Sequence, residues 1–481
     1  MSSPMNRLPP EVLGQIFSAL RAPIDLLRSP EQSSNPISTL PTVCSQWRET
    51  VLSLQILWSW LVLEYRPMDE RLWDEEQGER ICRMTETILT RARSAPLTIQ
   101  FYSRGDNDEY PPNLGRVLNA LCRRSGQWVE LHFSSFSLSF LRHPEFRVAK
   151  GNLGDLSHLY LDVDEDGSLD VFTDCPALRT IVLCGDSLCL EMNIPWQQIQ
   201  KTFVCVDPGL QIPFLRLMTR CSNLNSLKLR LISTGASGAE VVGHNISTNI
   251  ETLTLLSHHS SAACNKLLFQ RLAFPKLSSL QISPSRLSRY RRRLDIAPLL
   301  DQLTRNPSPI TSLSLKRVHL SDEQRLRLLE LVPGLETLDI AEAYGSGSNT
   351  KNKVQKNLSW TSRFLDELLI NDDLPQGIAD PSPSPPLLPK LRNLILRVHQ
   401  HDIDFDKLYE VARSRCSDAA DSTSDRWKGL RSLEIISYRE GDPNTGVLLE
   451  EQISLEHGVE RLESLKDIGL EFSLRDAPGP Q

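Results

Sequence analysis

Residues 156–161 read LSHLYL, and this pattern of apolar places, L-x-x-L-x-L, decides the fold expected for the chain. Leucine or isoleucine returns at the same three places in LRTIVL (178–183), LNSLKL (224–229), IETLTL (250–255), LSSLQI (277–282), ITSLSL (310–315), LETLDI (335–340), LRNLIL (391–396) and LRSLEI (430–435). Weaker copies are Trp128-Leu131-Phe133, Ile199-Thr202-Val204, Leu365-Leu368-Ile370 and Leu462-Leu465. Because alternate residues of a strand point to the same face, each copy predicts a short strand with one apolar side.

Helix-like segments separate these strands, and the spacing between copies lies mostly at or near the roughly 20–29 residues of leucine-rich repeats. One copy cannot bury its apolar face alone, whereas stacked neighbours share a continuous core, so the pattern predicts an α/β solenoid. The alternative is an unrelated α/β protein that is rich in leucine. We expect the solenoid to span residues 126–475 after a linking or capping region at 66–125, with Pro/Ser-rich loops near 345–355, 376–389 and 414–425.

The first 65 residues have a different, helical pattern. Four apolar residues at i, i+3, i+4 and i+7 make one face of a helix over residues 8–20, where Pro9, Pro10 and Glu11 suit the first turn: Leu13, Ile16, Phe17 and Leu20. Helical spacing returns from Leu40 to Leu54, with Ser38 or Thr39 as its cap. A short turn is expected at 24–27, and residues 54–65 look like a buried turn entering a strand.

Three pieces of this segment together resemble the F-box motif, particularly the F-box-like form of large fungal families: LPPEVLGQIFSAL (8–20), VCSQWRETV (43–51) and LW (57–58). An F-box followed by leucine-rich repeats is a common architecture of that family. The interval from Leu20 to Val43 is longer than in a compact F-box, and the repeats lack the usual Asn or Cys after the last strand leucine. The resemblance therefore implies a helical F-box at residues 1–65 and an irregular leucine-rich-repeat-like α/β solenoid.

The resemblance also implies a non-catalytic role. F-box proteins are substrate receptors of SCF-type cullin ubiquitin ligases: the F-box binds a Skp-family adaptor, which bridges to the cullin, and the repeats hold a protein substrate. At the matching positions, the adaptor-binding residues would be Leu8, Pro9, Glu11, Ile16, Phe17, Leu20, Val43, Cys44, Trp47 and Trp58. Three alternatives are a protein-interaction scaffold that uses no cullin, an enzyme with an unrecognised site, and an N-terminus that merely caps the solenoid.

Composition narrows the function classes. Acidic residues number 60 and basic residues 53, giving a formal charge of −7. This balance argues against broad nucleic-acid binding, which needs a positive field. No apolar run is long enough to cross a membrane, the N-terminus has no export signal, and the ten cysteines form no CxxC pair. We therefore expect reduced thiols, several of them buried, in a cytoplasmic or nuclear protein.

Few residue clusters suggest chemistry, and we expect neither a cofactor nor a metal. Residues 162–170 match a calcium loop in part, but Thr173 stands where the bidentate Glu belongs, so an acidic loop is the better interpretation. The histidine pairs 258/259 and 399/401 and the glycine-rich stretch 345–353 are interpreted as surface features. The dense basic cluster predicts a site for acidic or phosphorylated substrates, or else a solvated loop: Arg286, Arg289, Arg291, Arg292 and Arg293.

Overall fold

The computed structural model describes residues 8–27, 35–65, 74–103, 112–136, 138–163, 169–184, 192–206, 210–231, 246–257, 269–284, 296–318, 320–341, 362–370, 386–399, 404–416, 429–438 and 459–477. Fifteen strands follow one another in chain order in one parallel sheet, from β1 to β17 without β9 and β11. This order confirms the predicted α/β class and is the one that a stacked-repeat solenoid produces. By packing, the chain divides into two units, essentially residues 1–224 and 225–481.

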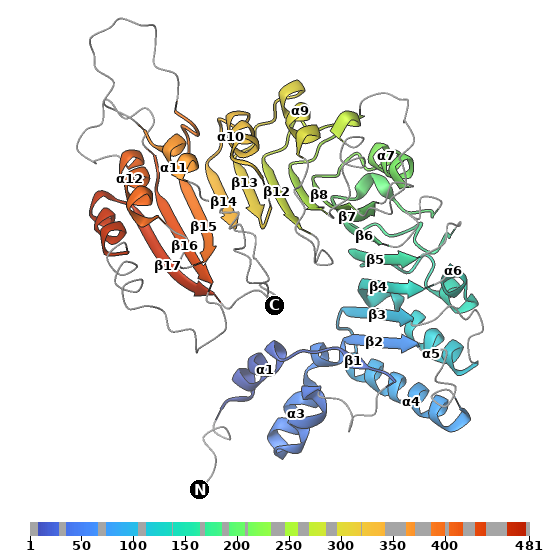
Figure 1. Ribbon diagram of the computed structural model, residues 1–481. Coiled ribbons are helices and arrows are strands. Elements are labelled where there is room, and N and C mark those ends of the chain that lie inside the picture. Colours follow the sequence, from blue (N-terminus) through green and yellow to red (C-terminus); the bar gives the residue numbers. More distant parts are fainter. Residues whose placement is uncertain are drawn as a thin grey trace, which may run out of the picture. The chain divides into compact units, whose positions relative to one another are not determined.

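The first unit holds seven strands of the sheet: β1 (Ile24–Asp25), β2 (Trp60–Tyr65), β3 (Leu97–Ser103), β4 (Trp128–Phe136), β5 (His158–Val163), β6 (Thr180–Cys184) and β7 (Lys201–Val206). Its helices are α1 (Pro10–Ala19), α2 (Pro36–Thr39), α3 (Ser45–Ser53), α4 (Glu75–Ala92), α5 (Pro112–Cys122), α6 (Leu138–Leu141) and α7 (Gln211–Arg220). Short 3-10 turns are η2 (Leu40–Thr42), η3 (Gln55–Trp58), η5 (Ser125–Gln127), η6 (Pro144–Val148) and η7 (Trp196–Gln198). Helices α4 and α5 cover one face of β2–β4 (Figure 1).

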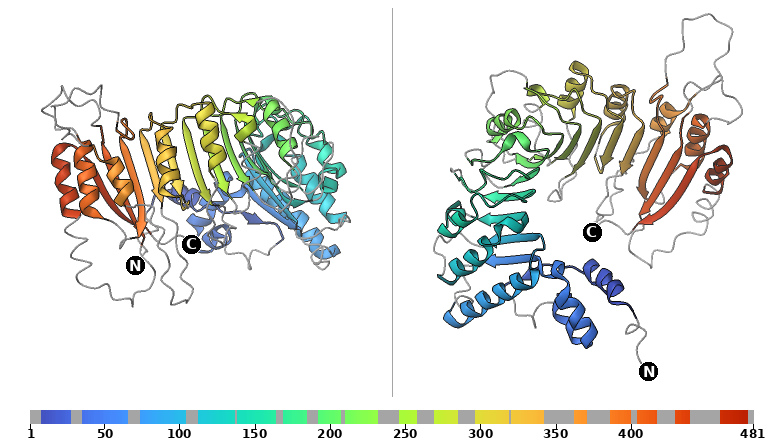
Figure 2. Two further views of the ribbon diagram at one scale, coloured as in Figure 1. Left: turned by 45° about the horizontal axis from the view of Figure 1, so that its top comes forward. Right: turned by 180° about the vertical axis from the view of Figure 1, so that it is seen from behind.

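The second unit continues with β8 (Ser226–Leu231), β10 (Thr252–Ser257), β12 (Ser279–Pro284), β13 (Ser312–Lys316), β14 (Thr337–Ala341), β15 (Asn393–His399), β16 (Ser432–Tyr438) and β17 (Glu471–Ala477). Two short strands pair separately: β9 (Ile246–Ser247) and β11 (Leu272–Ala273). One face of this part of the sheet carries helices and a 3-10 turn (Figure 2): α9 (Ala297–Arg305), α10 (Asp322–Glu330), α11 (Ser362–Leu368), α12 (Phe405–Arg415) and η9 (Ser464–Ile468). The opposite strand face carries no helix among the described residues, and we call it the open face.

The repeat pattern explains how the core forms. In each clear copy, the first apolar residue and the two strand residues that follow it are buried, as Leu156, Leu159 and Leu161 are. Parallel pairing matches equivalent places on successive strands, so Leu159 pairs with Ile181. The same side chains therefore stack from strand to strand in one continuous apolar layer, and each repeat is stabilised by its neighbours.

The sheet reaches further toward the N-terminus than the copies of the pattern indicate. Leu61 and Leu63 on β2 pair with Ile99 and Phe101 on β3, and all four are buried. Aromatic rings thicken the core there: Phe101 stacks on an equivalent phenylalanine of β4, with ring centroids 5.0 Å apart, and two further rings pack edge-on, Phe140 and Phe146. Isoleucine and phenylalanine stand at the strand positions of β3, which hides that strand from a search for leucines.

Two of the weaker copies were wrong as strands. Leu365 and Leu368 are buried residues of the helix α11, and Leu462 and Leu465 lie in the helical turns that precede β17. In both pairs the spacing of three residues also fits one face of a helix. The last strand instead contributes Phe472 to the core, three residues after Gly469, which ends η9 in the left-handed conformation at φ 91°.

The N-terminal segment departs from the predicted helices in two places. Cys44 is extended, at φ −161° and ψ 172°, so the helix expected from residue 40 to residue 54 is split into η2 and α3. The predicted cap is also wrong: Ser38 and Thr39 lie within α2, which the buried Asn35 caps, and the Thr39 side chain makes no cap hydrogen bond to η2. Residues 24 and 25 form the strand β1 against β2 rather than an isolated turn, whereas the turn into β2 is confirmed.

Candidate protein-interaction surface

One face of α1 holds the N-terminal helices together. Leu13 and Phe17 are buried against α3, where Val51 is also buried. The Phe17 ring meets the Trp47 ring edge to face at 5.0 Å between centroids. Since these residues lie at helical spacing on α1 and α3, two short helices that would be marginal alone become one packed pair.

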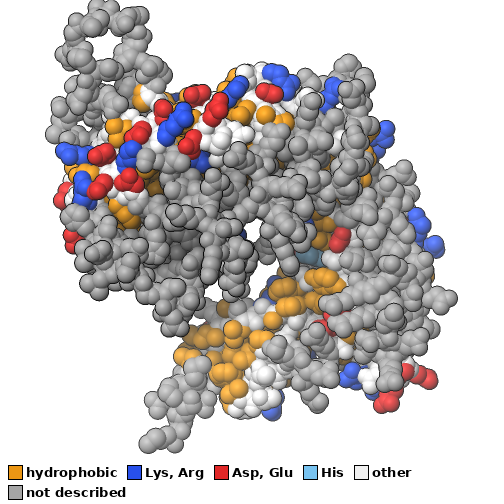
Figure 3. All heavy atoms as spheres, in the orientation of Figure 1, with side chains coloured by type: hydrophobic (Ala, Val, Ile, Leu, Met, Phe, Trp, Pro, Cys, Tyr) orange, Lys and Arg blue, Asp and Glu red, His pale blue; other side chains and the backbone are white. Residues whose placement is uncertain are grey.

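A second apolar stripe of α1 faces away from this core. Val12, Ile16 and Leu20 succeed one another at four-residue intervals, and 38–45% of each side chain is exposed. Val43, at the helix break, is 57% exposed, and Leu52 of α3 is 39% exposed. Apolar side chains gather over this part of the molecule in Figure 3. We call these five residues the N-terminal apolar surface.

This surface is unusual for the chain. Among the residues that the structure describes, eight large hydrophobic side chains are exposed, and five of the eight lie between residues 12 and 52. Scattered single apolar residues on a protein surface need no explanation, but a cluster of them marks an interaction site. The surface therefore fits a partner that covers an apolar helix face.

Hydrogen bonds and ring contacts fix the surface on the sheet. The Trp58 indole donates to the Val51 carbonyl at 3.0 Å, and the Arg91 guanidinium lies 4.4 Å above the Trp58 ring. The Asn35 side chain accepts from the Ile37 amide at 2.9 Å and donates to the Pro23 carbonyl at 2.7 Å. These contacts tie α2 to Pro23, directly before β1, and tie α3 through Trp58 to η3 and α4, so the apolar surface is supported by the elements that begin the sheet.

The predicted adaptor-binding residues fall into two groups. Exposed or half-exposed on the N-terminal helices are Leu8, Pro9, Glu11, Ile16, Leu20, Val43, Cys44 and Trp47. Phe17 and Trp58 are buried, so they position the helices rather than touch a partner. Val12 and Leu52 belong to the surface but were missed, although the four-residue interval from Val12 to Ile16 is visible in the sequence.

Of the other predicted features, the structure describes only part. Asp170, in the acidic loop, forms an ion pair with Lys150, and this contact lowers the pKa of the Asp170 carboxyl. Residues 164–168, the arginine cluster 286–293, the glycine-rich stretch 345–353 and His258, His259 and His401 lie outside the described residues. In the described ranges, no group of three or more His, Cys, Asp or Glu side chains is placed to hold a metal ion.

Buried thiols are confirmed. Burial raises the pKa of three cysteine thiols to about 12, which keeps them protonated and unreactive at neutral pH: Cys122, Cys175 and Cys221. An open groove beside α5 has a lining of mixed charge that includes Arg116, Arg123 and His143. Burial lowers the pKa of His143, whose ring nitrogen accepts from the Glu145 amide as the cap of η6.

Comparison with known proteins adds no further assignment. No protein-family model matches the chain, and no curated protein matches it significantly. No helix in the described part of the chain has both the length and the apolar character required to cross a membrane.

Proposed function

We propose that this chain is a substrate-recognition subunit of an SCF-type cullin ubiquitin ligase. In this proposal the N-terminal helices bind a Skp-family adaptor and the repeats bind a protein substrate. The observation that carries it is the coincidence of motif and exposure: Ile16, Leu20 and Val43 are F-box-like positions and are also exposed members of the N-terminal apolar surface.

Physical reasoning supports a protein partner for this surface. Val12, Ile16 and Leu20 form a stripe along a helix, which fits a partner with an apolar groove or helix face. Fully burying a large apolar side chain contributes roughly 1.5–3 kcal/mol, and the five residues of this surface are 38–57% exposed, so each contributes part of that and binding needs the whole surface. The core behind the stripe, Phe17 on Trp47, keeps the helix in place before the partner arrives.

Co-purification with a Skp-family adaptor tests the proposal. The full chain is expected to bind the adaptor, and the double variant Ile16→Glu/Val43→Glu is expected to lose that binding, because both side chains are exposed and need not disturb the core. A matched control is Val148→Glu/Ile212→Glu, at two apolar residues that are 40% and 44% exposed elsewhere in the same unit. The control is expected to bind as the wild type does.

The outcomes are distinct. If the folded wild type binds no adaptor, the assignment fails and the helices are a solenoid cap. Adaptor binding without recruitment of a cullin would favour the alternative of an interaction scaffold. The arginine cluster 286–293 remains a proposed substrate contact, and its replacement by alanine without loss of substrate capture would remove it.

A further inference from the structure

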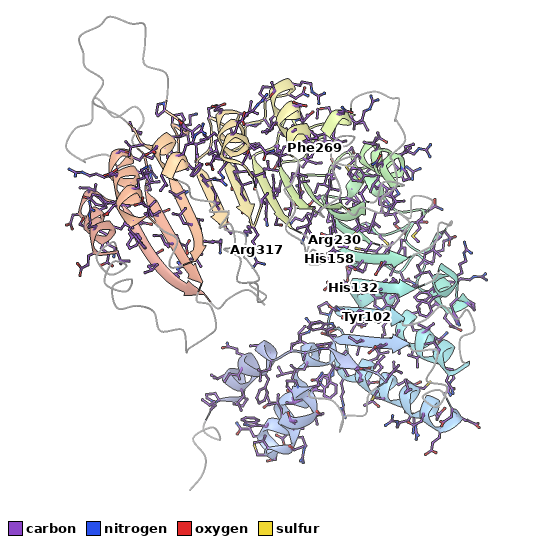
Figure 4. The ribbon with its side chains drawn as sticks, viewed as in Figure 1. Tyr102, His132, His158, Arg230, Phe269 and Arg317 are labelled. Atoms are coloured by element: carbon purple, nitrogen blue, oxygen red, sulfur yellow. The ribbon has the colours of Figure 1, made fainter. Side chains whose placement is uncertain are left out.

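The last strand of the described sheet has a long edge that no other described strand covers. Strand β13, which ends directly before Arg317 in Figure 4, pairs on both sides, with β12 and β14. In the described part of the chain, β17 pairs with β16 alone and lies at the end of the sheet (Figure 1). Its seven residues, Glu471–Ala477, therefore present a row of backbone donors and acceptors along one edge. Such an edge is a ready template for another strand.

The apolar core is also incompletely covered at this edge. Leu474 pairs in register with Ile435, so it stands at the place of the last leucine of a repeat. The three preceding strands hold that place with residues that are at most 2% exposed: Ile340, Leu396 and Ile435. Leu474, in contrast, is 39% exposed. Each earlier repeat is covered by the next one, and a further strand beside β17 would cover Leu474 in the same way.

The backbone fixes which residues of β17 turn toward the open edge. The Glu471 amide donates to the Arg431 carbonyl at 2.8 Å, so the backbone groups of Glu471 turn toward β16. Because the direction of these groups alternates along a strand, those of Phe472 and Leu474 turn the other way. An added strand must therefore form its hydrogen bonds with Phe472 and Leu474.

The sequence of this edge is complementary to itself in an antiparallel register. When Ser473 stands opposite its own copy, Phe472 stands opposite Leu474 of the second copy, and these two residues can exchange their backbone hydrogen bonds. Both side chains then lie on the core face, so the apolar layer continues from one copy into the other. The same register sets Glu471 opposite Arg475 of the second copy, once on each side of the twofold axis. Opposite charges directly across a strand pair stabilise it.

Neighbouring registers lose these matches. Centring the pair on Phe472 or on Leu474 keeps the hydrogen-bonding residues aligned. It sets Arg475 opposite Gly469 in the first case and opposite Ser473 in the second, and neither residue carries a charge. The register centred on Ser473 is therefore the one that matches charge with charge and apolar side chain with apolar side chain.

Arg475 has room for a second carboxylate. Its Nε lies 3.3 Å from Glu434 of the same copy, and the side chain is 70% exposed. The guanidinium has two further nitrogens that donate hydrogen bonds, so it can bind Glu434 and an exposed Glu471 of the second copy together. Asp476, the other charged residue of the strand, stands in this register opposite Leu470 rather than opposite an acid.

We propose that the edge of β17 pairs with the same edge of a second copy of this chain. The contact is isologous, so it closes after two copies. Charged residues on an edge strand usually prevent association, but here the two signs meet each other across the twofold axis. Seven residues make a small interface, so the dimer should form reversibly at micromolar concentrations. The inference does not rest on the proposed function.

Sedimentation equilibrium of the full chain across micromolar concentrations tests the inference, and we expect a monomer–dimer equilibrium. Glu471→Arg sets like charges opposite each other at two places and should weaken the dimer about ten-fold. Matched controls are Glu410→Arg and Arg413→Glu, which reverse exposed charges on α12 and should dimerise as the wild type does. Matching melting curves exclude unfolding as the cause of any loss.

Restoring the charge match is the sharper test. Arg475→Glu alone should also weaken the dimer, whereas an equal mixture of Glu471→Arg and Arg475→Glu chains should form heterodimers, because each copy then faces its opposite charge. The double variant Glu471→Arg/Arg475→Glu should dimerise again for the same reason.

A disulfide reports the register. Ser473 meets its own copy at a non-hydrogen-bonded place, where Cα atoms are about 4.5 Å apart and a disulfide can form. Diamide, which accepts two electrons and two protons from two thiols, should therefore link two copies of Ser473→Cys. Ser432→Cys, on β16, is the control that should not link, since three strand spacings of about 4.8 Å separate the two copies there.

Three results would overturn the inference. A monomer at every concentration would leave the edge to a strand of a different protein. A dimer that Glu471→Arg does not weaken would place the contact on another surface. Equal weakening by Glu471→Arg and by the α12 controls would show a general effect of charge rather than this pairing.

Discussion

Phe17 and Trp47 meet edge to face, with their ring planes at 65°, and this contact joins α1 to α3. The neighbouring residue Ile16 lies outside this contact and is 38% exposed. Two consecutive residues of one helix therefore have separate tasks: Phe17 builds the support, and Ile16 belongs to the surface that the support presents.

We expect alanine at Phe17 to lower stability and alanine at Ile16 to weaken adaptor binding. Phe17→Ala should lower the free energy of unfolding of the first unit by about 3–5 kcal/mol, because a buried ring leaves a cavity. Ile16→Ala should change it by less than about 0.5 kcal/mol but weaken adaptor binding. Chemical denaturation and adaptor titration measure both. Equal destabilisation by the two variants would contradict the division of tasks.

Arg415 should be a large contributor to the stability of the second unit. It is buried and donates to three backbone carbonyls, those of Leu368, Leu387 and Leu388, at 2.6–2.9 Å. Burial lowers the pKa of its guanidinium to about 10, so the group is still charged at neutral pH. Arg415→Met would leave these carbonyls without donors and should cost about 2–4 kcal/mol in denaturant unfolding.

Arg413 provides the control, because it is an exposed residue of the same helix. Arg413→Met should leave the unfolding midpoint nearly unchanged. Similar midpoints for the two methionine variants would show that the buried hydrogen bonds of Arg415 contribute little.

The pairing of β6 with β7 can be tested by oxidation. Leu183 pairs with Val204, and the next residue on each strand is a cysteine; the Cys184 and Cys205 sulfurs are 3.3 Å apart. Diamide, which accepts two electrons and two protons from two thiols, should link them in the folded chain. Peptide mass spectrometry detects the disulfide, and Cys205→Ser should abolish it. Linkage of either cysteine to a different cysteine, and not of the two to each other, would contradict this register.

Asn35 should stabilise the N-terminal segment through its cap on α2. Asn35→Ala removes the acceptor of the Ile37 amide and the donor to the Pro23 carbonyl, and should cost about 1–2 kcal/mol locally. Hydrogen exchange of the Ile37 amide measures the effect directly. Thr39→Ala, at an exposed hydroxyl of the same helix, is expected to leave that protection unchanged.

Most of the sheet follows from the sequence, because stacking demands the same apolar places in every repeat. Leu159, Leu253 and Leu394 are all buried strand residues, as their pattern predicts. Prediction failed where apolar spacing fits two structures: Leu365 and Leu368 satisfy a strand pattern and a helix face equally, and the chain uses the helix. Strand β3 was not predicted, because isoleucine and phenylalanine replace leucine there.

Which residues of the candidate site are exposed could not be predicted from the sequence, because it depends on tertiary packing. The helical period of α1 is visible in the sequence, but the period does not say that Leu13 and Phe17 are covered while Val12, Ile16 and Leu20 stay exposed. That choice is made by α3, whose position follows from the break at Cys44 and from Trp58 beneath it.

The sequence alone determined the repeated strand and the order of the sheet, because a local period of apolar residues is sufficient to specify both. The neighbours on the open face were decided by register: Lys316, Arg397 and Arg475 stand at equivalent positions on β13, β15 and β17. Residues that lie far apart in sequence become a row only because parallel pairing sets equivalent places about 4.8 Å apart. Side chains on the open face are free of the packing that governs the core, so only the folded sheet shows which of them meet.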